Sequence, residues 1–174
     1  GVSAGIGQAP ALLVEPAPGL PARDPKGDTD DDVARVTAAL SKVADRLDAR
    51  ALEADPSAIG VLMATAMMAR DPGLTSSVRT HLVEGDGPAH ALWGAIDDFC
   101  AQLTAAGGYL AERVTDLHNV RDRALAVLQG LPEPGVPAFD SPVILVAEDL
   151  APADTATLDP ELVRGLVTAA GGPT

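Results

Sequence analysis

The chain has 174 residues, which is enough for one large domain or two small ones. Hydrophobic residues make up 47% of the sequence and exclude a disordered chain, while the 2% of aromatic residues and the 32 alanines favour closely packed helices over a β-sandwich. The formal net charge of −13 argues against nucleic acid and anionic membranes as partners, and it is compatible with a basic protein partner.

Proline placement predicts a helical middle between two non-helical flanks, because proline breaks helix interiors. Five of the 15 prolines precede Val33 and seven follow Gln129, so only three fall between them. In the first flank, the apolar run 11–14 is typical of a strand. A first helix is expected to begin at the acidic residues 30–32, and its apolar side chains recur at spacings of three and four through Leu47.

Four further helices are expected, separated by proline and glycine signals. The second begins at 55–56 and stops at 71–73, and a short third helix ends at 85–88. Glycines 107–108 close the fourth helix, and the fifth ends at Gly130. Apolar stripes separated by short turns predict an antiparallel helical bundle.

The last part of the chain has a different character. Residues 131–137 have the composition of a linker, the β-branched run 143–147 predicts a strand buried on both faces, and 162–168 predicts another strand. Three strands are too few for a finished domain. The sequence therefore predicts an α+β, mainly helical fold, with the bundle inserted into an incomplete α/β domain. The expected boundaries are 1–29 for the N-terminal strand and linker, 30–130 for the bundle, and 131–174 for the second linker and the rest of the α/β domain.

None of the usual catalytic constellations is present in the sequence. His81, His90 and His118 fall in different expected helices or at their edges, and no cluster has metal-ligand spacing, so each is expected to be a surface or capping residue. Cys100 is expected to be a small buried hydrophobe. As the single cysteine it excludes an internal disulfide, which is typical of the cytoplasm. No apolar run approaches the ~18 residues of a membrane span, and no basic-then-apolar leader opens the chain.

The second helix has the most informative pattern. The face expected to line the core contains Ile59, Leu62, Met63 and Ala66. A separate stripe on the opposite side consists of Val61, Thr65 and Met68. A helix that is apolar on two sides is either buried all round or docks a partner, and periodicity leaves both open. Methionine favours docking, since it adapts to a partner's shape.

Several stretches follow the motifs of one known family in the family's order. Residues 141–156 match a VILVA-x-DL-x-P strand and turn, and 169–174 match the start of the GG-x-TSH-x-A motif that follows it. Residues 1–9 are similar to an opening G-x-x-x-S-P-G without its Ser-Pro pair. Residues 66–72 are similar to L-L-x-D-P, and 109–113 to Y-L-x-E-R. The chain resembles enzyme I of the bacterial phosphoenolpyruvate:sugar phosphotransferase system.

This resemblance implies both a fold and an activity. Members of the family take a phosphoryl group from phosphoenolpyruvate onto a histidine and pass it to the small carrier protein HPr. Their N-terminal half is a phosphohistidine (swivelling) domain with an inserted bundle that docks HPr, and a C-terminal barrel binds phosphoenolpyruvate and magnesium and forms the homodimer. By the resemblance, this chain is a cytoplasmic HPr-binding fragment without a cofactor of its own. It is expected to be inactive alone, because the active histidine would be the second residue past Thr174.

The resemblance also implies roles for individual residues. Thr155 matches a family threonine whose hydroxyl can hydrogen-bond the active imidazole. The positions that face HPr in the family correspond to Val61, Thr65, Met67, Met68, Asp71, Leu74, Leu110 and Arg113. Where many relatives have an acid pair, this chain has Pro72-Gly73, so the electrostatic share of docking is expected to fall on Asp71 and other acids. None of the three histidines receives the catalytic role.

Two other interpretations stay open at this point. One is a non-enzymatic helical interaction module that shares these strings. The other is the phosphohistidine domain of a dikinase relative, which also carries a GG-x-x-SH loop but is not expected to have helices inserted between Val33 and Gln129. Both phosphohistidine interpretations require that Ser-His follow Thr174 in the parent gene.

Overall fold

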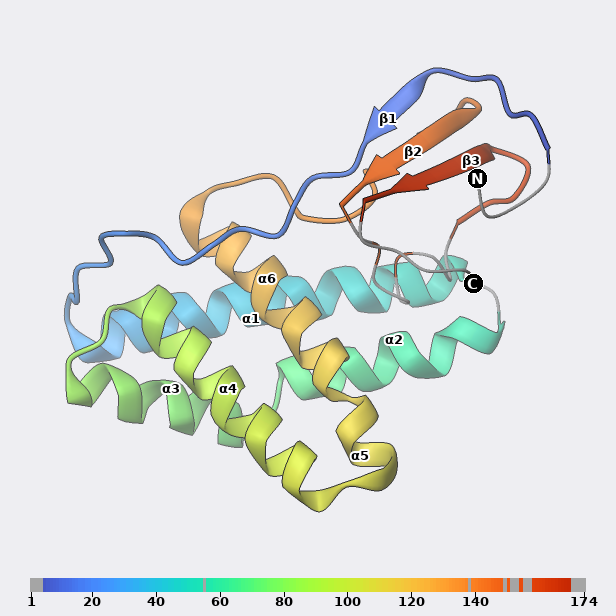
Figure 1. Cartoon of the computed structure of the whole chain (residues 1–174). Helices are drawn as coiled ribbons and strands as arrows, with labels where there is room; N and C mark the ends of the chain where they lie inside the picture. Colours follow the sequence, from blue (N-terminus) through green and yellow to red (C-terminus); the bar gives the residue numbers. More distant parts are fainter. Residues whose placement is uncertain are drawn as a thin grey trace. The chain divides into compact units, whose positions relative to one another are not determined.

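The structure, a computed structural model of the whole chain, describes residues 5–54, 56–137, 139–148, 150, 154 and 158–169. Within these residues the chain forms six α-helices and three β-strands, drawn in Figure 1. The chain divides into two compact units. The helical unit is Pro18–Pro132, and the sheet unit combines Gly1–Ala17 with Glu133–Thr174. The fold is mainly helical with a small parallel sheet, as the sequence predicts.

Except at the break between the last two, the helices of the helical unit begin and end close to the signals expected from the sequence. They are α1 Thr29–Glu53, α2 Pro56–Ala69, α3 Pro72–Glu84, α4 Pro88–Ala106, α5 Gly108–Glu112 and α6 Val114–Gln129. The Asp28 carboxylate caps α1 by accepting from the backbone N–H of Asp30 at 2.9 Å and of Asp31 at 3.2 Å. Gly130 ends α6 in the left-handed conformation, with φ 66°, which glycine adopts without strain.

The core of the helical unit is built around α1. Its residues Val36, Leu40, Val43 and Leu47 recur at spacings of four, three and four and are buried. α1 contacts α2, α3, α4 and α6, and α4 contacts α3 and α6 (Figure 1). Small side chains let the helices approach closely, since many of the alanines that face the core are almost wholly buried. The Ala-rich composition is thereby explained.

The expected single last helix is wrong, because the structure divides it into α5 and α6 at Arg113. The backbone N–H of Arg113 donates to the carbonyl of Leu110, three residues back, at 3.0 Å, which tightens the turn. The Arg113 guanidinium then pairs with Asp116 in the first turn of α6 at 2.9 Å. The acidic side chain at the start of α6 also suits the positive end of that helix.

The sheet unit contains a three-stranded parallel sheet in the order β1-β2-β3. The strands are β1 Ala11–Leu13, β2 Val143–Ala147 and β3 Val163–Thr168. Val143, Leu145 and Ala147 of β2 are buried, and the residues between them are half-buried. The expectation of a strand buried on both faces is therefore wrong for one face of β2. The small core of this unit is formed by these three side chains and Val14.

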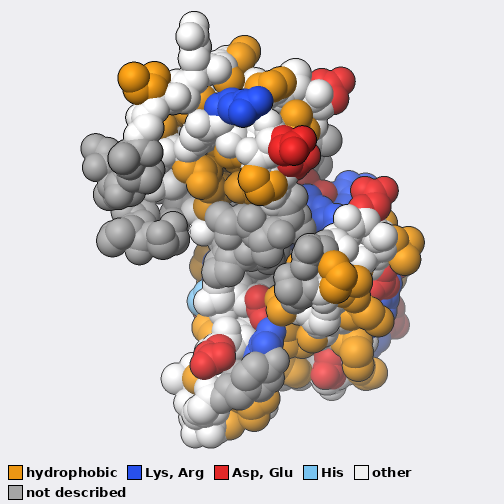
Figure 2. Space-filling model, turned by 90° about the vertical axis from the view of Figure 1, so that its right-hand side faces the viewer, with side chains coloured by type: hydrophobic (Ala, Val, Ile, Leu, Met, Phe, Trp, Pro, Cys, Tyr) orange, Lys and Arg blue, Asp and Glu red, His pale blue; other side chains and the backbone are white. Residues whose placement is uncertain are grey.

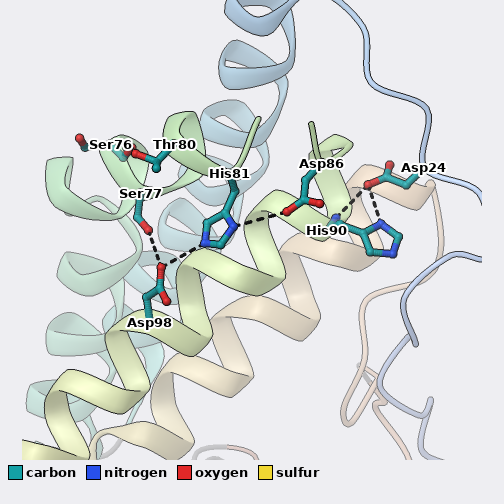
Figure 3. A network of polar contacts seen from close by, with 8 residues as sticks. All are labelled: Asp24, Ser76, Ser77, Thr80, His81, Asp86, His90 and Asp98. Carbon is teal, nitrogen blue, oxygen red and sulfur yellow. Dashed lines mark hydrogen bonds and ion pairs between the residues drawn. The ribbon is translucent and has the colours of Figure 1, made fainter. Parts of the chain in front are cut away.

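The boundary of the helical unit falls at Pro18, earlier than the expected residue 30, because the segment 18–28 is fastened to helices far along the chain. Gln129 donates its amide to the Gly19 carbonyl at 3.0 Å. The Asp24 carboxylate accepts from the backbone N–H of His90 at 2.8 Å and lies 3.0 Å from the ring Nδ1 of the same residue (Figure 3). Asp24 thus caps the first turn of α4, although it lies 66 residues before His90 in the sequence.

Candidate docking surface

Helix α2 contains no charged residue, and it exposes several large apolar side chains. Met67 is 73% exposed and Met63 is 51% exposed, and Val61 is also at the surface. We call Val61, Met63 and Met67 the α2 surface. Figure 2 shows hydrophobic side chains gathered at the surface of the helical unit, beside acidic and basic ones. A surface helix ordinarily turns charged side chains to water, so an uncharged helix with exposed methionines is typical of a docking element.

The structure differs from the predicted faces of α2 at two residues. Met63 was expected in the core and is exposed, whereas Thr65 was expected on the docking stripe and is only 3% exposed. The core face is centred on Leu62, Ala66 and Ala69, which lie at i, i+4 and i+7 and are buried. Thr65 tolerates burial because its hydroxyl donates to the Val61 carbonyl at 2.9 Å.

Helix α3 and its cap provide the next two predicted contact residues. Asp71 is exposed and caps α3, accepting from the backbone N–H of Gly73 at 2.7 Å. Leu74 is fully buried in the core. The side chains of Leu74 and Thr65 therefore offer no surface to a partner, which corrects their assignment as contact residues.

The remaining predicted contact residues are spread over α2, α5 and the residue after α5. Met68 is half-buried against the core. Leu110 is exposed on α5. Arg113 is half-buried and paired with Asp116. α6, which follows α5, contacts α2. The exposed predicted residues are thus Val61, Met67, Asp71 and Leu110, and Met63 joins them as a residue that the periodicity placed on the wrong face.

Two ion pairs hold the C-terminal end of α2 against α1. The Arg70 guanidinium lies 2.7 Å from Asp45 and 2.8 Å from Asp48. Hydrogen bonds to Asp45 and Asp48 raise the pKa of Arg70, so the side chain remains charged. Because these groups are largely exposed, each pair contributes little to stability, and its effect is to fix the direction in which α2 ends.

The described residues contain no candidate metal centre. Among them, no group of three or more His, Cys, Asp and Glu side chains could hold a metal ion. Cys100 is buried, and burial together with the charge of Asp97 raises the pKa of its thiol, as befits an inert core residue. Thr155 and residues 170–174 lie outside the described residues. In the part of the chain that the structure describes, no helix is both long and apolar enough to cross a membrane.

Comparison with known proteins identifies the family. A family model described as the N-terminal part of phosphoenolpyruvate-utilising enzymes matches residues 1–113, and a second, described as their mobile domain, matches residues 139–174. The chain belongs to the family of phosphoenolpyruvate-utilising enzymes.

Within this family, the chain is similar to phosphoenolpyruvate-protein phosphotransferases. A phosphoenolpyruvate-protein phosphotransferase of Streptomyces coelicolor is 46% identical over 164 residues, which are 94% of this chain and 29% of the relative. One of Lactococcus lactis subsp. lactis is 32% identical over 180 residues, covering 99% of this chain and 31% of the relative. An NMR solution structure of an Enzyme I protein (nEIt) is similar with a TM-score of 0.82 and 26% identity, covering 98% of this chain and 72% of that one.

These matches confirm the resemblance to enzyme I. They extend over nearly the whole chain, which favours the enzyme I interpretation over the two alternatives. The chain spans less than a third of the length of the two phosphotransferases.

Proposed function

We propose that this chain is the part of a phosphoenolpyruvate-protein phosphotransferase that docks the carrier protein HPr. The observation that carries the proposal is the α2 surface, where methionines are exposed on a helix without a single charge. Such a surface loses free energy in water and gains it when a partner covers it. The proposed arrangement is a helical docking bundle inserted into a phosphohistidine domain to which the sheet unit belongs.

Charge gives the second argument for HPr as the partner. The chain has a net charge of −13, and Asp71 stands exposed at the end of the α2 surface. An apolar centre beside acidic groups suits a partner with an apolar patch and basic neighbours. Opposite charges steer the encounter and set its orientation, while the apolar contact supplies most of the affinity.

The proposed chemistry belongs to the full-length enzyme. The phosphorus–oxygen bond of phosphoenolpyruvate breaks as a phosphorus–nitrogen bond to a histidine forms, and the enolate that leaves takes up a proton to become pyruvate. The phosphoryl group then passes to a histidine of HPr. By the family resemblance, the histidine that takes the phosphoryl group from phosphoenolpyruvate would be the second residue past Thr174, and the Thr155 hydroxyl would orient its ring. Phosphoenolpyruvate, magnesium and dimerisation are assigned to a C-terminal domain, and docking by the helical unit uses none of them.

The substitution Met67→Glu tests this proposal. It places a charge within the α2 surface without disturbing the core, since the side chain points to solvent. We expect the affinity for HPr, measured by isothermal titration calorimetry, to fall about tenfold or more, as for the loss of a central contact.

Val83→Glu is the matched control, because Val83 is 66% exposed on α3 and lies outside the proposed surface. It should leave the affinity unchanged. The docking proposal fails if Met67→Glu binds HPr as tightly as the unmodified chain does, or if the unmodified chain does not bind HPr at all.

A further inference from the structure

His81, near the end of α3, lies between two carboxylates that belong to different elements (Figure 3). Its Nε2 is 3.0 Å from Oδ2 of Asp98 on α4, and its Nδ1 is 3.4 Å from Oδ2 of Asp86 in the turn between the two helices. Ser77, one turn earlier on α3, donates its hydroxyl to the same Asp98 oxygen at 3.2 Å. The ring therefore joins α3, the turn and α4 at one point.

A carboxylate lies beside each of the two ring nitrogens of His81, and this arrangement suits one protonation state of the ring better than the other. A neutral imidazole has one N–H, so it donates to one carboxylate and turns a lone pair toward the other. An imidazolium has two N–H groups and donates to both, with a charge that the two carboxylates balance. Only the imidazolium of His81 satisfies both Asp86 and Asp98.

Gly94 on α4 provides the space for this ring. A Cβ on residue 94 would lie 2.6 Å from Cε1 and 2.9 Å from each ring nitrogen of His81. The ring thus rests directly on the backbone of α4. Glycine inside a helix is destabilising relative to alanine, so the space that His81 requires explains why α4 carries a glycine here.

We infer that His81 is a proton-dependent latch, which fastens the end of α3 to α4 while its ring is an imidazolium and loosens when the ring loses a proton. After that proton passes to solvent, the ring keeps one hydrogen bond and faces the other carboxylate with a lone pair. Either Asp86 in the turn or Asp98 on α4 is then released. The inference is independent of HPr docking.

The direction of the pH dependence follows from the pKa of His81. Burial of the ring is the largest single influence and lowers the pKa, but the hydrogen bonds and charges of Asp98 and Asp86 together outweigh it and raise the pKa above the ordinary value of 6.5. The latch therefore contributes its full stabilisation below pH 6.5, as long as Asp86 and Asp98 are ionised. This stabilisation is lost as the pH rises through the raised pKa of the folded state.

The other charged groups on the surrounding elements are engaged elsewhere or face solvent. On α4, Asp97 lies 3.9 Å from the Arg121 guanidinium. On α1, which also packs against α3, Asp30 pairs with Arg79 of α3 at 2.7 Å. Glu84, in the last turn of α3, is exposed. Asp86 and Asp98 are thus the described acids that set the behaviour of His81.

Titration of the full chain by NMR tests the latch. The His81 ring protons should titrate above 6.5, Asp98→Asn should lower that pKa, and Asp97→Asn, the neighbouring change on α4, should leave it in place. Thermal unfolding followed by the fluorescence of Trp93, the one tryptophan of the chain, gives the second measurement. Below pH 6.5, the melting temperature of His81→Gln should be about 2–4 °C lower than that of the unmodified chain, and the difference should vanish well above the folded-state pKa.

Two control variants keep the outcome decisive. His118→Gln on α6 should retain the pH-dependent behaviour of the unmodified chain, and Gly94→Ala should displace the ring and abolish that behaviour. A His81 pKa at or below 6.5, or a stability difference that does not change with pH, overturns the inference. If His81→Gln does not fold, Asp98→Asn and Asp86→Asn provide the same comparison of melting temperature against pH.

Discussion

Exposed and buried side chains follow one another closely from α2 into α3. Met63 and Met67 are at the surface, whereas Thr65 and Leu74 are inside the helical unit. Thr65 keeps its hydroxyl satisfied through the Val61 carbonyl, so its burial leaves no polar group unpaired. Leu74 belongs to the buried hydrophobic core of the helical unit, and its role is to stabilise that core.

Leu74→Ala should therefore destabilise the chain without acting on a partner directly. Deleting a fully buried leucine side chain costs about 2–5 kcal/mol, through lost burial and the cavity that remains. Urea unfolding followed by Trp93 fluorescence measures this loss. Leu52→Ala is the matched control, since Leu52 is 89% exposed and its truncation should change stability by no more than about 0.5 kcal/mol. If Leu74→Ala instead kept the stability of the unmodified chain and lost HPr binding, Leu74 would be a contact residue and this prediction would be wrong.

Among the elements, the segment 18–28 shows how side chains can fasten a proline-rich stretch that has no regular structure. The Asp24 carboxylate is 9% exposed and takes the backbone N–H of His90, a group that the start of α4 cannot satisfy within the helix. Glycine at position 87 leaves room for this contact, because a Cβ there would collide with the Asp24 carbonyl oxygen. Asp24 is thus a helix cap supplied from 66 residues away.

Asp24→Ala should lower the stability of the helical unit by about 1 kcal/mol, the usual cost of losing a helix cap. It should also speed hydrogen exchange at the His90 amide, which then has no acceptor in the segment. Hydrogen exchange by NMR checks both effects, with Arg23→Ala in the same segment as the control, because Arg23 is exposed. Equal exchange at His90 in the unmodified chain and in Asp24→Ala would contradict the proposed cap.

The sequence predicted those elements whose signals are local. Pro56, Pro72 and Pro88 each begin a helix, and the run 143–147 is a strand as expected. Met63 and Thr65 of α2 were assigned to the wrong faces because the helix has no charged residue to show which side faces water. The helix break at Arg113 and the hydrogen bond from His90 to Asp24 depend on contacts that cannot be read from the spacing of apolar residues. The docking residues came from family motifs, and the structure then separated the exposed ones from the buried ones.

Taken over the full chain, the amino-acid composition suits the proposed function. The Ala-rich helical unit packs small side chains closely around α1, so it needs few aromatic residues. The chain's net charge of −13 suits a basic partner, and the uncharged α2 exposes apolar side chains for contact with it. The proposal therefore assigns partner recognition to this chain and phosphoryl transfer to the full-length enzyme.

Chemical-shift mapping of the isotope-labelled full chain with unlabelled HPr tests the docking claim most directly. If α2 docks HPr, the amide shifts should concentrate on residues 60–71, with smaller changes around Leu110 and none in the sheet unit. Shifts confined to the sheet unit, or no shifts at millimolar HPr, would contradict the docking claim.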